Sequence, residues 1–356
     1  MKSTPKSVLV VGGGIIGLTS AFRLAMANHH VTVFDPTVAR GATWAAAGMI
    51  APSAEIAPGE ESNYALQKQA LQSWHELAEL LRSLTGESLH FGHTGTLLVG
   101  WDASDRRQLD QFASVAVEFN APFTKVTSQD SPDLFQGLSP RITEGILMAD
   151  DAWIDPDHAV RLLTSGLATL GAIVIEEEVT NLSSENGQVI ANTKDHRYTG
   201  DLGIVATGAN GLPNGARSKA HNIRPVRGAT VRVRGIDRSA QPSVRAFVRG
   251  RAFYMVSRPG GYCVLGASAD ERSDAVLEVG ELQRLLRDGL DVVPELETAT
   301  VLETRIGLRP ASPNLEPFFE RLELAGWAWS SGHYRHGVTL APLAALDALE
   351  FVEGSR

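Results

Sequence analysis

The chain alternates between short apolar runs of strand length and longer segments in which apolar residues recur every three or four positions. Apolar runs cover residues 8–11 and 31–34, and residues 15–27 between them follow the spacing of an amphipathic helix. This order predicts a strand, a helix and a second strand, the repeating unit of parallel α/β folds.

A glycine-rich turn joins the first strand to the helix. The turn has the spacing G-x-G-x-x-G at Gly12, Gly14 and Gly17. These glycines allow a tight turn, close approach of the backbone to a pyrophosphate, and close packing of the helix on the strand. Asp35 follows the second strand roughly 20 residues later, where an acidic side chain can bind the ribose hydroxyls of an adenosine. We therefore expect a dinucleotide-binding turn. A structural glycine-rich loop is the alternative, and it accounts for fewer of these features.

Further helices are predicted from periodicity and capping residues. Apolar positions at helical spacing cover residues 64–84 and 279–290, and residues 343–351 form a terminal helix. Asp155 and Pro156 open another helix as its cap and its first residue.

Strand patterns occupy much of the remaining sequence. The expected strands cover residues 172–175 and 202–205, alternating β-rich sequence covers residues 224–268, and short strand-like pieces such as 95–99 fill residues 91–147. Within the β-rich part we expect a hairpin with strands at residues 252–257 and 262–267. Residues 307–310, Gly-Leu-Arg-Pro, are expected to form a turn.

Composition limits the class of protein. With 356 residues, 43% of them hydrophobic, the chain is long enough for two globular domains. The net charge of −9 argues against a general nucleic-acid binder. Eight arginines nevertheless lie between Arg224 and Arg251. They indicate either a strand with one solvent-facing side, as the alternation at residues 230–234 would give, or a basic funnel for an anionic substrate.

Cysteine content and hydropathy bear on location. Cys263 is the only cysteine, so we expect no intramolecular disulfide, no cysteine metal site and a reducing cytoplasm. The apolar stretch at residues 8–26 contains four glycines and Arg23, which makes a signal peptide or membrane helix a poor interpretation. We expect no membrane span and no metal.

Five motifs together resemble the D-amino-acid oxidase superfamily of FAD enzymes, and within it the glycine oxidases associated with thiamine biosynthesis. These motifs are residues 12–17, 45–49, 206–208, 307–310 and 332–337. They occur in order along essentially the whole chain. The resemblance implies an α/β fold with a discontinuous Rossmann-like FAD-binding domain, a second β-rich α+β substrate domain, and FAD held without a covalent bond.

The domains are expected to be interleaved. Residues 1–88, 148–220 and 302–356 would form the FAD-binding domain, and residues 89–147 and 221–301 the substrate domain.

The resemblance also implies which residues bind FAD, because each occupies a matching motif position. They are Gly12, Gly14, Ile15, Ile16, Gly17, Asp35, Pro36, Ala42, Thr43, Ala47, Gly48, Met49, Val179, Thr207, Gly208, His333, Tyr334, Arg335, His336, Gly337, Val338 and Thr339. For His333 and His336 we expect backbone contacts or packing instead of catalysis, since the sequence offers no partner for either. Cys263 on its apolar strand is expected to pack as a small hydrophobe; a covalent flavin link is the alternative.

Three residues are assigned to the substrate by the same resemblance. Arg309 suits a carboxylate because a planar guanidinium donates two parallel hydrogen bonds. Arg335 and Tyr254 match family residues near the same group. The alternatives are a structural ion pair for Arg309, a structural or flavin-packing role for Arg335, and an ordinary half-buried tyrosine for Tyr254.

Four residues depart from the family pattern. They are Trp44, Ala229, Ser257 and His336. None of them removes a group that the chemistry needs.

The expected function is FAD-dependent oxidative deamination of glycine or another small amino acid or amine. Its products would be an imine and then a 2-oxo acid, with ammonia and with H2O2 formed from O2, and it could feed thiamine thiazole synthesis. The alternatives are an FAD-dependent amino-acid dehydrogenase, a D-amino-acid or sarcosine oxidase, and a non-catalytic dinucleotide-binding protein. The expected partners are the small substrate and O2, without nucleic acid, and the sequence allows a homo-oligomer.

Overall fold

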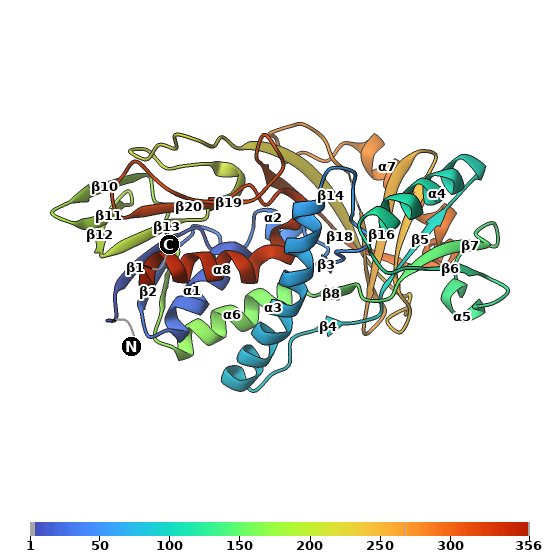
Figure 1. The fold of residues 1–356 in the computed structure, drawn as a ribbon, viewed down its shortest axis with the longest axis horizontal. Coiled ribbons are helices and arrows are strands. Elements are labelled where there is room, and N and C mark those ends of the chain that lie inside the picture. The colour runs from blue at the N-terminus through green and yellow to red at the C-terminus, as the bar shows by residue number, and fades with distance from the viewer. Residues whose placement is uncertain (1–3, 267, 355–356) are drawn as a thin grey trace.

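The computed structural model describes residues 4–266 and 268–354, and two large sheets form its framework. Figure 1 shows a six-stranded sheet with its helices in one half of the molecule and an eight-stranded sheet in the other half. The long helix α3 (Glu61–Thr85) crosses the view between the two halves.

The six-stranded sheet is parallel except at one edge, where β19 is antiparallel. In spatial order its strands are β19 (Phe318–Arg321), β20 (Trp327–Ser331), β13 (Leu202–Val205), β1 (Ser7–Val11), β2 (His30–Phe34) and β9 (Ile173–Ile175).

Side chains of β1 alternate between two cores because successive residues of a strand face opposite sides. Val8 and Val10 pack against a helical layer, whereas Leu9 and Val11 pack against a small antiparallel sheet. The helical layer consists of α1 (Ile15–Met26), α3, α6 (Pro156–Thr169) and α8 (Gly337–Glu353). The small sheet consists of β10 (Asn181–Glu185), β11 (Gln188–Asn192) and β12 (Arg197–Gly200).

The eight-stranded sheet is antiparallel except for the parallel pair β15 and β5. Its order is β18 (Thr300–Ala311), β14 (Arg224–Arg234), β17 (Tyr262–Gly266), β16 (Arg251–Arg258), β15 (Ser243–Val248), β5 (Thr96–Gly100), β7 (Glu144–Met148) and β6 (Thr124–Thr127). Phe253 and Met255 of β16 face a core shared with α7 (Val279–Val292), and Tyr254 and Val256 face the opposite side.

Shorter elements connect the two halves. Helix α4 (Ala103–Glu118) packs on β5, and α2 (Ala42–Ala45) packs on β18. The remaining elements are a sheet of β3 (Met49–Ile50), β8 (Ala152–Ile154) and β4 (Phe91–Gly92), helix α5 (Pro132–Phe135), and 3₁₀ turns at Gly208–Asn210, Pro294–Thr298 and Tyr334–His336.

Most predicted elements are confirmed. The first strand–helix–strand unit corresponds to β1, α1 and β2, and the hairpin corresponds to β16 and β17. The predicted end of the second hairpin strand at residue 267 lies outside the described residues. Asp155 caps α6 as expected, since its Oδ1 accepts hydrogen bonds from the N–H groups of Asp157 (3.1 Å) and His158 (3.4 Å).

Helix α4 was not predicted, because residues 91–147 were expected to form only short strand-like pieces. Asp102 and Asp105 form a capping box at its start. Leu109, Ala113 and Ala116 are its buried apolar positions, at helical spacing.

The expected turn at residues 307–310 is also wrong, because these residues belong to β18. The strand pairs with β14 along its length, with Gly307 opposite Gly228 and Arg309 opposite Val226. The segment that carries Arg309 is therefore part of the eight-stranded sheet.

The terminal helix α8 begins at Gly337, six residues before the predicted start, and contains Pro342. Proline lacks the N–H that would bond to the carbonyl four residues earlier. That carbonyl, of Val338, instead accepts a hydrogen bond from Trp74 Nε1 at 3.0 Å. A side chain of α3 thus satisfies the carbonyl that the proline leaves free.

The arginines of β14 do not form a solvent-facing side. Arg227 and Arg232 are 2% and 1% exposed, so both faces of the strand are buried. None of the eight arginines between Arg224 and Arg251 lines the main cavity described below, which argues against a basic funnel. Among the described helices, none is both long and apolar enough to cross a membrane.

Candidate functional site

A cavity of about 730 Å³ lies between the two halves of the molecule. It is lined by the turn after β1, by the segment around α2, by the ends of β13 and β20, and by β18 and the start of α8. Of the residues predicted to bind FAD or substrate, all line this cavity except Gly17, His336 and Thr339.

The glycines after β1 fit closely between neighbouring backbone atoms. Gly12 has φ of +111°, and a Cβ there would lie 2.4 Å from the carbonyl oxygen of Ala206. A Cβ at Gly17 would lie 1.8 Å from the carbonyl oxygen of Gly12, and Gly17 does not line the cavity. Only glycine fits at either position.

The start of α1 is open to an anion. Gly14 is the N-cap and offers no side chain, and the first turn contains no acidic residue. The N–H of Ile15 donates to Thr43 Oγ1 at 3.0 Å, which ties the helix start to α2. Because a helix start carries partial positive charge and unpaired N–H groups, this end of the cavity suits a pyrophosphate.

Asp35 is fixed at the end of β2. Its Oδ2 accepts a hydrogen bond from the N–H of Gly13 at 2.6 Å, and its Oδ1 accepts one from the N–H of Thr37 at 2.8 Å. Asp35 and the buried Val179 both line the cavity. The two bonds hold the carboxylate in place, and its remaining lone pairs are available to hydroxyl groups.

The start of α8 also lines the cavity. His333, Tyr334, Gly337 and Val338 line it, and α8 has no side-chain cap and no acidic residue in its first turn. Burial, with a smaller effect of His336, lowers the pKa of His333 to about 4. His333 is therefore neutral at pH 7, and the helix start supplies the positive potential there.

Arg309 and Tyr254 converge over the eight-stranded sheet because glycines make room for them. Arg309 on β18 lies over Gly228 of β14, where a Cβ would be 2.2 Å from Arg309 Nη2. Tyr254 on β16 lies over Gly266 of β17, where a Cβ would be 2.2 Å from Tyr254 Cζ. Since β14 and β17 are the two strands between β18 and β16, the polar groups lean toward each other.

Arg309 is held without an ion pair. Its Nη1 donates to the carbonyl oxygens of Ser268 (3.1 Å) and Arg227 (3.3 Å), and no carboxylate of the described residues lies within 4 Å. The guanidinium therefore keeps donors for a bidentate contact with a ligand carboxylate. Burial raises the pKa of Tyr254 although the charge of Arg309 opposes this, so the phenol stays protonated and can donate.

Arg335 differs from Arg309, because acidic side chains surround it. Its Nη2 lies 2.7 Å from Glu60 Oε2, and its Nε lies 3.9 Å from Glu55 Oε2. These ion pairs favour the structural alternative for Arg335, although it lines the cavity.

Glu55 is the main residue that the sequence analysis missed. It lines the cavity and also a second one of about 330 Å³, and its Oε2 lies 3.2 Å from His336 Nδ1. Burial opposes ionisation of Glu55, but His336, Arg245 and Arg335 outweigh it and lower the pKa of Glu55 to about 2. Its loop has no helix or strand period, and the partner of His336 could not be read from the sequence.

Trp44, one of the four departures from the family pattern, and Cys263 both lie outside the cavity lining. Trp44 does not line the cavity; its ring lies 5.1 Å from the guanidinium carbon of Arg305 and 5.4 Å from that of Arg40. Cys263 is fully buried in the eight-stranded sheet and also lies outside the cavity lining, so it packs as a small hydrophobe.

The fold and the cavity define an FAD-dependent oxidoreductase. The family model of FAD-dependent oxidoreductases, DAO, matches residues 7–349, and the chain belongs to this family. The glycine cradle, the two open helix starts and the fixed Asp35 fit the pyrophosphate, the ring and the ribose of FAD.

Known proteins resemble the chain along nearly its whole length. The glycine oxidase of Geobacillus kaustophilus is 27% identical to this chain, and the aligned region covers 97% of this chain and 92% of the oxidase. Its crystal structure has a TM-score of 0.88 at 26% identity, covering 98% of this chain and 95% of that one. The glycine oxidase of Pseudomonas putida is 29% identical over 98% of this chain and 95% of its own. The structure of iminodiacetate oxidase from Chelativorans sp. BNC1 has a TM-score of 0.86 at 26% identity, with 98% and 95% covered.

Proposed function

We propose that this protein oxidises glycine or another small amino acid or amine at its α-carbon, with O2 as the second substrate. The observation that carries this proposal is the convergence of Arg309 and Tyr254 over the eight-stranded sheet, where both line the FAD cavity. Arg309 has no carboxylate partner among the described residues, so it is free to bind the carboxylate of a substrate.

The residues position the substrate. Arg309 donates a bidentate pair of hydrogen bonds to the carboxylate, and Tyr254 adds a third donor from its phenol. FAD, when bound, accepts the electron pair that leaves the α-carbon and its nitrogen. The amino acid, O2 and water become a 2-oxo acid, ammonia and H2O2, with the imine as the product of the oxidation itself. For glycine, that imine could supply thiamine thiazole synthesis.

No general base at the α-carbon is included. Glu55 is the one carboxylate of the described residues that lines the cavity beside Arg335 and Tyr254. With a pKa of about 2, it is a weak proton acceptor at neutral pH. Oxidation of a neutral amine by hydride transfer needs no such base.

The predicted domain division, a cytoplasmic location and homo-oligomer formation remain part of this proposal. The cavity supports the predicted domain division in one respect, because residues assigned to both domains line it.

A panel of small amines tests the proposal, with glycine, sarcosine, D-alanine and proline as substrates and H2O2 as the detected product. We expect substrate loss and H2O2 release at equal rates. Anaerobic bleaching of the flavin without H2O2 in air would identify a dehydrogenase. No bleaching by any amine would leave a non-catalytic dinucleotide-binding protein.

The matched variants are Arg309→Met and Arg309→Lys. We expect Arg309→Met to raise KM at least about a hundredfold and Arg309→Lys less, because lysine keeps the charge but cannot donate two parallel bonds. Flavin absorbance should be unchanged in both. Wild-type KM in Arg309→Met would remove Arg309 from the site.

A further inference from the structure

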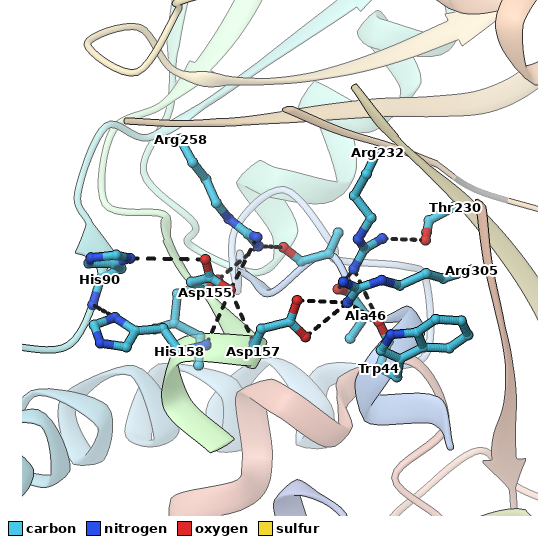
Figure 2. A network of polar contacts seen from close by, with 12 residues as sticks. Trp44, Ala46, His90, Asp155, Asp157, His158, Thr230, Arg232, Arg258 and Arg305 are labelled. Carbon is cyan, nitrogen blue, oxygen red and sulfur yellow. Dashed lines mark hydrogen bonds and ion pairs between the residues drawn. The ribbon is translucent and has the colours of Figure 1, made fainter. Parts of the chain in front are cut away.

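A segment next to the FAD cavity, of which residues 45–49 line it, has its carbonyl groups bonded from behind, four of the six by side chains of the eight-stranded sheet. This carbonyl-clamped segment consists of residues 44–49. Arg232 Nη2 donates to the carbonyl oxygens of Trp44 (3.1 Å) and Ala46 (3.0 Å), and Arg258 Nη2 donates to that of Ala47 (2.5 Å). Figure 2 shows the guanidinium groups of Arg232, Arg258 and Arg305 gathered beside this segment.

The remaining carbonyl groups of the segment are bonded as well. Arg305 Nη1 also donates to Trp44 O at 2.9 Å, and Thr230 Oγ1 donates to Ala45 O at 3.0 Å. The carbonyls of Gly48 and Met49 accept from the N–H of Ile154 (2.8 Å) and from Thr339 Oγ1 (3.2 Å). Six consecutive carbonyls therefore have donors, which fixes the orientation of each peptide.

The N–H groups of two of these peptides have no such partner. The peptide with the carbonyl of Ala46 carries the N–H of Ala47, and the next peptide carries the N–H of Gly48. Neither N–H has an acceptor among the described residues, and both residues line the cavity. Because C=O and N–H point in opposite directions in a trans peptide, arginines behind the carbonyls direct both N–H groups away from themselves.

Arg232 differs from its neighbours in charge balance. Arg258 lies 3.4 Å from Asp155, and Arg305 lies 2.7 Å from Asp157 and 2.6 Å from Glu303. No carboxylate of the described residues lies within 4 Å of Arg232, although its side chain is 1% exposed. Burial, with the charge of Arg305, lowers the pKa of Arg232, in agreement with the lack of a close carboxylate. An uncompensated buried cation is costly, and nearby negative charge would stabilise it.

We propose that Arg232 and Arg258 are positioning residues that orient and polarise the N–H groups of Ala47 and Gly48 as donors to the flavin ring, and that Arg232 thereby favours added negative charge on the flavin. A hydrogen bond to a cation strengthens the donor at the other end of the same peptide, because bonded dipoles polarise one another in a low dielectric. The inference depends on FAD binding and not on which amine is oxidised.

Sulfite tests the proposal without any amine substrate, because it adds to oxidised flavin and places negative charge on the ring. The series is Arg232→Lys, which keeps the charge; Arg232→Gln, which keeps only a neutral donor; and Arg232→Met, which keeps neither. We expect sulfite affinity to fall least in the lysine variant and at least about tenfold in Arg232→Met. The midpoint potential is measured separately, and a tenfold less favourable reduction would lower it by about 30 mV for a two-electron couple.

Arg234→Met is the matched control. Arg234 lies two residues along β14, on the same side of the strand, and its side chain is exposed. The Arg234→Met variant should have the same sulfite affinity and the same flavin midpoint potential as the wild type. Arg258→Met should behave like Arg232→Met, because it frees the carbonyl of the adjacent peptide.

Two results would overturn the proposal. One is FAD-loaded Arg232→Met and Arg258→Met with wild-type sulfite affinity and potential; a purely structural role would give this, together with a lower Tm. The other needs no variant: a crystal structure of the FAD-bound wild type in which the N–H groups of Ala47 and Gly48 do not contact the flavin. If Arg232→Met does not retain FAD, equal potentials for Arg232→Gln and wild type would refute the role of charge.

Discussion

At the scale of single residues, the proposed substrate site depends on two glycines of the eight-stranded sheet. Gly228 and Gly266 lie on the inner strands β14 and β17, and the heads of Arg309 and Tyr254 occupy the space where a Cβ would be. Strands favour β-branched and aromatic residues, so glycines within them mark a close approach of other atoms. The approaching atoms here belong to the two proposed substrate ligands.

Gly266→Ala should therefore move Tyr254 and little else. The new Cβ would lie 2.2 Å from Tyr254 Cζ and 2.3 Å from its hydroxyl oxygen, so the ring must shift while the strand stays in place. We expect KM for the amino acid to rise about tenfold, or about 1.4 kcal/mol, with kcat and FAD affinity nearly unchanged. Steady-state kinetics and flavin fluorescence measure these quantities.

Gly280→Ala is the control for Gly266→Ala. The nearest atom to its Cβ is the end of the Arg284 side chain at 3.4 Å, and we expect wild-type kinetics. An unchanged KM in Gly266→Ala would exclude Tyr254 from binding the carboxylate.

His333 gives the stability of the protein a defined dependence on pH. Its pKa is about 4 when folded, because of burial and then His336, and 6.5 is its ordinary value. The unfolded chain therefore binds the proton first as pH falls. The contribution of His333 is fully present above pH 6.5 and is lost between about pH 6.5 and 4, by at most about 3 kcal/mol.

Urea unfolding at pH 7 and pH 5, with saturating FAD, measures this effect. The decrease in the free energy of unfolding between the two pH values should be smaller in His333→Asn than in the wild type. His30→Asn is the control, because His30 is exposed and should leave the decrease unchanged. Equal decreases in the wild type and His333→Asn would show that another group titrates.

At the scale of elements, α8 shows how tertiary contacts override local propensity. Pro342 lies inside this 17-residue helix, and the carbonyl that it leaves free accepts the indole N–H of Trp74 from α3. Trp74 Nε1 also lies 3.1 Å from the carbonyl oxygen of Thr339. The first turn of α8 lines the FAD cavity, so this contact holds in helical form a segment that is proposed to bind FAD.

Trp74→Phe should destabilise the protein by about 1–3 kcal/mol, because the buried carbonyl of Val338 loses its donor. FAD affinity should fall as well, since the start of α8 is less well fixed. Thermal unfolding and FAD titration test both effects. Gln72→Ala, at an exposed position of α3, should change neither. Wild-type FAD affinity in a destabilised Trp74→Phe would separate the helix contact from the site.

Elements with a complete periodic pattern could be predicted from the sequence, and elements shaped by distant partners could not. Residues 8–34 form β1, α1 and β2 as expected, because each has its own apolar period and the glycines join them. Helix α4 is an exception to this division: it has a local signal in its Asp102 capping box, but its apolar positions are sparse and the flanking sequence is strand-like.

The site divides in the same way. Motif positions such as Gly12 and Arg309 line the cavity as expected. The contact of His336 with Glu55 and the bonds from Arg232 to residues 44–46 join segments far apart in the chain, and no local pattern records them. The alternation at residues 230–234 is compatible in sequence with a solvent-facing side or a basic funnel. The structure favours neither, because Arg232 is buried and binds backbone carbonyls of residues 44–46.

At the scale of the whole molecule, the cavity joins segments from both ends and from the middle of the chain. The turn after β1, the carbonyl-clamped segment and the start of α8 all line it. Arginines of the eight-stranded sheet bind carboxylates at the start of α6, which packs on the parallel sheet: Arg258 with Asp155, and Arg305 with Asp157. The two halves are thus tied together directly beside the cofactor site.

FAD should therefore protect distant segments at the same time. Hydrogen exchange at short labelling times reports local opening, and a ligand that contacts a segment suppresses that opening. We expect FAD to slow exchange at residues 12–17, 45–49 and 333–338 in parallel, with the same dependence on FAD concentration, while α4, which lies outside the cavity lining, exchanges as in the apoprotein. Protection of residues 12–17 alone would mean that only the pyrophosphate end is formed before substrate arrives. In Arg232→Met, residues 45–49 should lose part of their protection while residues 12–17 keep theirs, because the arginine acts on one segment of a site that the whole chain assembles.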